Sequence, residues 1–146
     1  MMKNFIKIIF PFIFQSEKIL FWQKMSNNLF IRGFKRCAFF IEGWIMSNYG
    51  CAISCQANLS KNIKFPHPIG IVIGAGVTLG ERVVIYQNVT IGRKSMDIDG
   101  YPIIENDVVI YCNAVVIGDI TVAEKTIVGA GSFLAKSTNN SQVFIS

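Results

Sequence analysis

The sequence predicts an all-β fold, a parallel β-helix built from short repeats, with a short α-helical segment before it. A branched or aromatic apolar residue returns every sixth position over long stretches from Ile53 to Leu134, and a small or β-branched residue stands four positions after most of them. An α-helix repeats about every 3.6 residues and a strand about every two, so neither explains this rhythm. A fixed hexapeptide period indicates a β-helix in which each hexad forms one side of a coil.

The first fifty residues lack this period and are predicted to be helical. We expect two helical stretches, 3–24 and 29–47, with a break near 26–28 and a turn at 48–50 where the hexads take over. The chain therefore divides into an N-terminal segment, residues 1–50, and a β-helical domain, residues 51–146.

Charge and aromatic residues are concentrated in residues 1–50. They hold seven Lys and Arg against two Asp and Glu, nine of the twelve Phe and both Trp, whereas residues 51–146 hold seven residues of each charge. Cations beside large apolar side chains suit contact with a membrane surface, and equally a cap packed on the first coil or on partner subunits. Nucleic acid is not an expected partner, because no binding motif accompanies the charge.

The sequence offers no convincing membrane span or signal peptide. The apolar run 8–14 is far shorter than the about 20 residues that a span requires, and it contains Pro11. No small-residue cleavage site follows it. We therefore expect a cytoplasmic protein, with peripheral contact at the inner face of the membrane as an option.

The hexads place thirteen residues on the axis of the predicted coil. These are Ile53, Leu59, Phe65, Ile73, Leu79, Ile85, Ile91, Ile104, Ile110, Val116, Val122, Val128 and Leu134. The partner positions, four residues later, include Ile63, Ile69 and Val77. The rhythm slips twice, with eight residues from Phe65 to Ile73 and thirteen from Ile91 to Ile104. The second insertion, at about 92–103, is polar and glycine-bearing, so it predicts an external loop bordering a site.

Cysteine usage favours structural thiols over metal or disulfide chemistry. Cys37, Cys51, Cys55 and Cys112 suit free thiols in a reducing compartment. With one histidine in the chain, no ligand set for zinc can be assembled from the usual Cys and His pairs, so no metal is expected.

His67 is the strongest candidate for chemistry. It is the only histidine, it stands between Pro66 and Pro68, and it falls at the first irregularity of the repeat. A general base needs a defined position, which the two flanking prolines favour, and imidazole is the side-chain group that ordinarily changes charge near neutral pH. The alternative is an ordinary polar surface residue.

Four segments carry a resemblance to a known family: PHPIGIVIGAGVTLG (66–80), IYQNVTIG (85–92), GYPII (100–104) and VVIGDITVAEKTIVGAGSFL (115–134). On these the chain resembles the hexapeptide-repeat acyltransferases, especially the serine O-acetyltransferases and the acetyltransferases of capsule and colanic-acid synthesis. The resemblance implies a left-handed parallel β-helix, a homotrimer, and acetyl-CoA as co-substrate in the groove between adjacent subunits. It also implies that His67 deprotonates an acceptor hydroxyl, which attacks the thioester directly.

Further site residues follow from the same resemblance and from charge. The first group of candidates for binding CoA is Gly92, Arg93 and Lys94, because the Arg93 and Lys94 cations suit phosphates. The second group is Gly129, Ala130 and Gly131, which leave room for the pantetheine arm. Candidates for binding the acceptor are Asn88, Asp97, Asp99 and Tyr101.

The acceptor is predicted from departures within the resemblance. Acids and an Arg-His pair that serine-specific members use fall at Ala52, Pro66, Gly100 and Tyr101 here. An amino acid carries an ammonium and a carboxylate, and burying either without a partner is costly. We therefore expect O-acetylation of a saccharide, as in capsule, exopolysaccharide or lipopolysaccharide precursors. The alternatives are a serine O-acetyltransferase of cysteine biosynthesis and a catalytically inactive trimeric scaffold.

Overall fold

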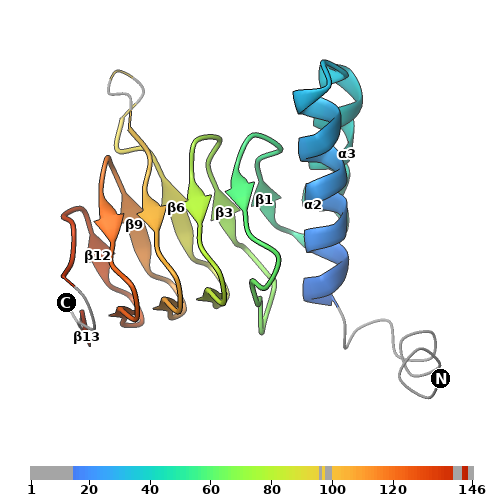
Figure 1. The fold of residues 1–146 in the computed structure, drawn as a ribbon. Helices are drawn as coiled ribbons and strands as arrows, with labels where there is room; N and C mark the ends of the chain where they lie inside the picture. Colours follow the sequence, from blue (N-terminus) through green and yellow to red (C-terminus); the bar gives the residue numbers. More distant parts are fainter. Residues whose placement is uncertain (1–14, 96, 98–99, 140–142, 145–146) are drawn as a thin grey trace.

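The computed structural model describes residues 15–95, 97, 100–139 and 143–144, and within them two helices precede a column of short strands (Figure 1). The helices α2 (Gln15–Ile31) and α3 (Lys35–Tyr49) lie side by side at one end of the column. The strands are β1 (Ala52–Ile53), β2 (Asn58–Leu59), β3 (Val72–Ile73), β4 (Thr78–Leu79), β5 (Val84–Ile85), β6 (Thr90–Gly92), β7 (Ile103–Ile104), β8 (Val109–Ile110), β9 (Val115–Ile117), β10 (Thr121–Val122), β11 (Ile127–Val128), β12 (Phe133–Leu134) and β13 (Val143–Phe144).

The strands form three parallel sheets, one for each side of a three-sided coil. Their orders are β1-β3-β6-β9-β12, β2-β4-β7-β10 and β5-β8-β11-β13. From β3 to β12, successive strands along the chain enter successive sheets, so three strands and three corners complete one coil. Ile73 pairs with Ile53 on one side and Ile91 on the other, and Val116 pairs with Ile91 and Leu134. Each axial residue therefore stacks on the axial residue of the next coil.

The predicted core is confirmed at all thirteen axial positions, none of which is more than 9% exposed. The partner positions follow the prediction at Ile63 and Val77, but Ile69 is wrong, because its side chain is 64% exposed. Ile71 fills that place instead, fully buried two residues before Ile73. The reason is that the two extra residues of the first irregularity lie between Phe65 and Ile71, so counting four onward from Phe65 ends in the corner.

The helical segment departs from the predicted break at 26–28, since α2 runs unbroken through those residues to Ile31. The chain turns at Gly33 instead, with φ +88°, a left-handed conformation that glycine adopts without a Cβ penalty. The predicted turn after α3 is confirmed at Gly50, where φ is +63° and the N–H bonds to the carbonyl of Met46 at 3.0 Å. Neither described helix has the length and hydropathy of a bilayer-crossing segment. Residues 1–14, which include most of the first predicted stretch, lie outside the described part.

The helices cap the first coil through directed hydrogen bonds. Gln23 Nε2 donates to the carbonyl of Ala57 at 3.1 Å, and Asn27 Nδ2 donates to the carbonyl of Cys55 at 2.8 Å. From α3, Glu42 accepts the backbone N–H of Cys55 at 2.9 Å. These side chains satisfy backbone groups that would otherwise lack partners at the end of the column.

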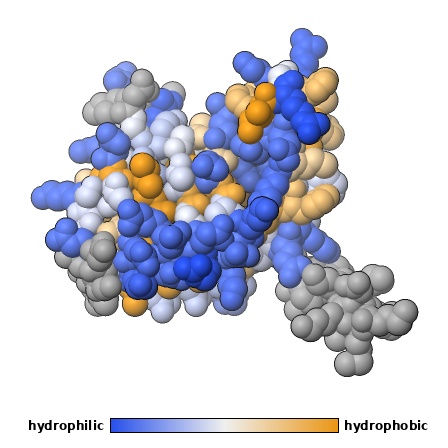
Figure 2. All heavy atoms as spheres, in the orientation of Figure 1, coloured by the Kyte–Doolittle hydropathy of each residue, from blue (hydrophilic) through white to orange (hydrophobic). Residues whose placement is uncertain are grey.

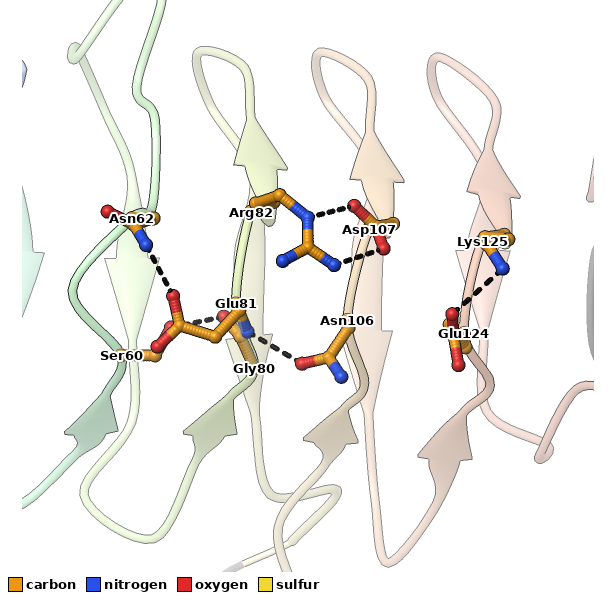
Figure 3. A network of polar contacts seen from close by, with 9 residues as sticks. All are labelled: Ser60, Asn62, Gly80, Glu81, Arg82, Asn106, Asp107, Glu124 and Lys125. Atoms are coloured by element: carbon orange, nitrogen blue, oxygen red, sulfur yellow. Dashed lines mark hydrogen bonds and ion pairs between the residues drawn. The ribbon is translucent and has the colours of Figure 1, made fainter.

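A polar ladder runs along the corner between the β2-β4-β7-β10 sheet and the β5-β8-β11-β13 sheet (Figure 3). Arg82 makes a two-point ion pair with Asp107, with Nε–Oδ1 and Nη2–Oδ2 both at 2.6 Å. Asn106 Oδ1 accepts the backbone N–H of Glu81 at 2.8 Å. Glu81 in turn accepts from Asn62 at 2.8 Å. These contacts tie consecutive coils together at a corner that contains no predicted site residue.

Candidate active site

His67 lies at the corner where the chain leaves the β5-β8-β11-β13 side of the first coil and enters β3. Its backbone carbonyl accepts the N–H of Ile69 at 2.8 Å, and the next residue, Gly70, has φ +67° and bonds through its N–H to the carbonyl of Gly50 at 2.9 Å. Pro68 is buried, whereas the His67 side chain is exposed. The corner is thus pinned through its backbone while the imidazole stays accessible.

Three rings follow one another along this corner, and we call His67, Tyr86 and Tyr111 the aromatic edge. The His67 and Tyr86 ring centres are 6.2 Å apart, and Tyr86 stacks on Tyr111 at 5.0 Å with 22° between the planes. The tyrosines come from equivalent places in neighbouring coils, because Ile85 and Ile110, the residues just before them, are paired. Sequence reasoning missed both tyrosines, although the shared position one after an axial residue was a usable signal.

The predicted residues Asn88 and Gly129–Gly131 also lie on this corner, in later coils. Asn88 has φ +57° and donates from Nδ2 to Asn113 Oδ1 at 3.2 Å. Gly131 bonds through its N–H to the carbonyl of Cys112 at 2.9 Å, and a Cβ added to it would meet no heavy atom within 4 Å. The corner beyond the tyrosines is therefore open to the close approach of an extended ligand.

The external loop lies on a different corner, between β6 and β7. Its base is fixed by the N–H of Gly118, which bonds to the carbonyl of Gly92 at 3.0 Å. Tyr101 lies over Gly76, where an added Cβ would come within 2.3 Å of the ring. Asp97 is exposed, with its backbone N–H bonded to Ser95 Oγ at 3.0 Å. Asp99 lies outside the described residues.

The predicted site residues thus fall on two corners that flank the same sheet, β1-β3-β6-β9-β12. One corner holds His67, Asn88, Gly129, Ala130 and Gly131, and the other holds Gly92, Arg93, Lys94, Asp97 and Tyr101. Within the single chain the described structure does not bring the two groups together. We call these two groups of candidate residues the half-sites, one on each side of this sheet.

Two cavities border these half-sites. The first, of about 670 Å³, lies between α2 and the first coil, and its lining includes Lys24, Lys61, Lys64 and Pro66, the neighbour of His67. The second, of about 530 Å³, lies between the end of α2 and the loop corner, where Tyr101 contributes to it. Both volumes are in the range of small-molecule sites.

The buried thiols are not poised for chemistry. Burial raises the pKa of Cys51, and burial together with the Glu42 carboxylate raises the pKa of Cys55 to about 12. Both thiols therefore stay protonated at neutral pH and are poor nucleophiles. Among the residues that the structure describes, no three His, Cys, Asp or Glu side chains gather as a metal site requires. His67 is left as the titratable side chain best placed for base catalysis on the aromatic edge.

Comparisons with known proteins match most of the chain to one group of enzymes. No protein-family model matches the sequence. A serine acetyltransferase of Buchnera aphidicola is 32% identical over 116 residues, which are 78% of this chain and 42% of that protein. Among solved structures, one match is serine acetyltransferase isoform 3 of Entamoeba histolytica in complex with cysteine. It has a TM-score of 0.82 at 28% identity, and the match covers 88% of this chain and 46% of that structure's chain.

A third match was solved with its co-substrate. Serine acetyltransferase of Brucella abortus in complex with coenzyme A has a TM-score of 0.78 at 26% identity. The match covers 81% of this chain and 48% of that structure's chain. The chain spans less than half the length of each of these three relatives. The predicted left-handed parallel β-helix is confirmed as the fold. The chain matches the hexapeptide-repeat acyltransferase family, since the relatives and solved structures that it resembles are serine acetyltransferases.

Proposed function

We propose that the chain is an acetyl-CoA-dependent O-acetyltransferase of the serine acetyltransferase type. The observation that carries the proposal is the match to serine acetyltransferases across the coils that hold His67 and the open corner beyond it. A relative bound to coenzyme A supports acetyl-CoA as the donor. The accessible imidazole on a pinned corner supports the assignment of a base.

The proposed reaction needs one residue of this chain to move a proton. A nitrogen of the neutral His67 ring accepts the proton of the acceptor hydroxyl while the hydroxyl oxygen attacks the thioester carbonyl carbon. The carbon–sulfur bond then breaks, the acetyl ester is released, and the imidazolium returns the proton to the departing thiolate. Backbone N–H groups at the corners are suitable donors to the transient oxyanion.

The two half-sites suggest how the donor is held. We propose that the chain works as a homotrimer in which the loop corner of one subunit faces the aromatic edge of its neighbour. The sheet between the two corners supports this, because its outward side chains include Val72 and Phe133, which are 40% and 56% exposed. The pantetheine arm would then run past Gly131, with Arg93 and Lys94 as phosphate partners.

Serine is the acceptor that the relatives favour, and the saccharide acceptor expected from the sequence finds no support among them. One observation keeps a saccharide as the second candidate. Pro66 stands where serine-specific members are expected to carry the acid that helps to hold the serine ammonium, so this position offers that group no charge. A neutral hydroxyl compound would not need one.

The test is release of free CoA thiol from acetyl-CoA by the purified full chain, with L-serine and with a panel of sugars in parallel. Faster turnover with L-serine supports the first acceptor, and faster turnover with a sugar supports the second. His67→Ala and His67→Asn should each lower kcat by about 10²–10⁴-fold, while Ser47→Ala, an exposed residue of α3, should not. Unchanged turnover in both histidine variants would reject the assigned base. Absence of both turnover and acetyl-CoA binding by calorimetry would favour the inactive scaffold.

A further inference from the structure

The turn between α2 and α3 presents exposed apolar and basic side chains to which the proposed reaction assigns no role. We call residues 30–40 the hairpin tip. Ile31, Phe34, Phe39 and Phe40 are exposed by 72%, 59%, 49% and 74%. Figure 2 shows hydrophobic and hydrophilic side chains side by side on the end of the helical pair farthest from Gln15. Large apolar side chains that are exposed together on one turn, and not scattered singly, are candidates for an interaction site.

Most apolar side chains of the tip are not the ones that the helical pair buries against the coils. Apart from Ala38, the buried residues of the helical pair lie outside the tip, among them Ile19, Gln23 and Ile45. Phe30 and Phe39 pack on each other with ring centres 6.0 Å apart, and Lys35 Nζ lies 5.7 Å from the Phe30 ring centre. Phe30 and Phe39 therefore support each other, while Phe34 and Phe40 stay exposed.

The charges of the tip select its partner. Arg32, Lys35 and Arg36 are exposed among the aromatic residues, and the sequence holds no acid from 30 to 41. A second copy docking symmetrically through the tip would set these cations against their own counterparts, which is unfavourable. A surface of anionic lipid offers the opposite charge and an apolar layer beneath it, which suits interleaved cations and aromatic rings.

We propose that the hairpin tip docks on the surface of an anionic membrane, with Phe34 and Phe40 entering the headgroup layer and the three cations contacting lipid phosphates. The tip adjoins the loop corner, because Phe30, Ile31 and Tyr101 line one cavity. Docking would therefore hold the loop half-site close to the lipid surface. The inference goes beyond the proposed acetyl transfer and does not depend on it.

The test measures co-sedimentation of the full chain with vesicles of phosphatidylcholine and phosphatidylglycerol at 3:1, and with vesicles of phosphatidylcholine alone. We expect binding to the anionic vesicles that weakens in 0.5 M salt, because screening shortens charge interactions. Each cation near the surface contributes about fivefold in affinity. Arg32→Glu with Arg36→Glu should therefore weaken binding by at least about 25-fold, and Phe34→Ser with Phe40→Ser by at least about tenfold.

Phe21→Ser is the matched control, since Phe21 lies on α2 outside the tip and is 62% exposed. It should bind as the unchanged chain does. Equal unfolding midpoints for all variants would show that lost binding is not lost folding. No binding to anionic vesicles, or an equal loss in Phe21→Ser, would overturn the proposal. A tip variant that lowers the oligomeric state in solution while leaving vesicle binding intact would also overturn it, in favour of a contact between copies.

A second measurement does not depend on substitutions at the tip's rings or charges. Cys37 is exposed within the tip, whereas Cys51 and Cys55 are buried. With Cys112→Ser removing the remaining accessible thiol, a polarity-sensitive fluorophore on Cys37 should shift its emission to the blue on anionic vesicles. An unchanged emission at saturating lipid would contradict insertion of the tip.

Discussion

Gly70→Ala offers a sharp test of how the corner around His67 is built. Gly70 has φ +67°, a region in which a side chain costs about 1 kcal/mol. An added Cβ would lie 2.2 Å from Asn88 Oδ1, so the Asn88 side chain must rotate. Rotation breaks its hydrogen bond to Asn113, at a cost of about 1 kcal/mol. The substitution should therefore lower the free energy of unfolding by about 2 kcal/mol.

A double-mutant cycle separates the two costs. Asn88→Gly removes the obstructing side chain and tolerates the φ of +57° at that position. In that background Gly70→Ala should cost only the backbone part, about 1 kcal/mol. Urea unfolding followed by tryptophan fluorescence gives the free energies. Because His67 belongs to the same corner, acetyl transfer by Gly70→Ala should fall, with acetyl-CoA binding retained. An equal cost in both backgrounds would refute the reasoning that Asn88 limits the space at Gly70.

Three further predictions concern the column itself. Ile110→Ala, on the axis, should lower the free energy of unfolding by about 2–5 kcal/mol, whereas Val109→Ala, facing outward, should cost less than about 1 kcal/mol; urea denaturation compares them. The Arg82 guanidinium holds the pKa of Asp107 below its usual value, so their exposed pair stabilises the fold above the unfolded-state pKa of Asp107 and loses that contribution as the pH falls through the lowered one. Asp107→Asn should therefore flatten the acid limb of the stability–pH curve slightly, and an unchanged limb would contradict the pairing. Cys55, with its pKa near 12, should resist a thiol reagent at pH 8 until denaturant is added, and rapid labelling of the folded chain at Cys55 would show that this thiol is accessible.

The axial core was predictable because one geometric rule governs it. Each side of the coil takes six residues and turns one large side chain inward, so the period survives without knowledge of long-range contacts. The rule failed at Ile69, since an irregular corner adds residues at a place that the period cannot locate. The structure pairs Val72 with Thr90, so Ile71 lies beside Val89 in the next coil. Only this register shows that Ile71, and not Ile69, occupies the inward partner position.

The helical segment was less predictable, because the polar residues in the middle of α2 were interpreted as a break between two helices. Ser26 and Asn27 suggested a break, but the structure uses them inside a continuous helix. Ser26 Oγ donates to the carbonyl of Ala38 at 2.7 Å, and Asn27 reaches the first coil. Such long-range partners are invisible in the sequence, whereas Gly33 was the local signal that marked the true turn.

The candidate residues could be proposed one by one from the sequence, but their grouping in space could not. His67 became a candidate because it is a single histidine at an irregular corner. Its grouping with Asn88 and Gly131, apart from the loop residues, depends on which corner of the coil each one occupies. That follows from counting residues per coil through both insertions. Tyr86 and Tyr111 were overlooked because aromatic residues just after an axial position look like ordinary surface residues until the coils are stacked.

The amide side chains of α2 have a consequence for assembly. A β-helix ends in unpaired strand edges, and such edges invite another column to add on, end to end. Gln23 and Asn27 donate hydrogen bonds to the carbonyl groups of Ala57 and Cys55 at this end, so the helices block the addition of another column there. A chain that lacks both helices would expose the unpaired backbone groups of its first coil. We expect such a chain to assemble end to end into filaments.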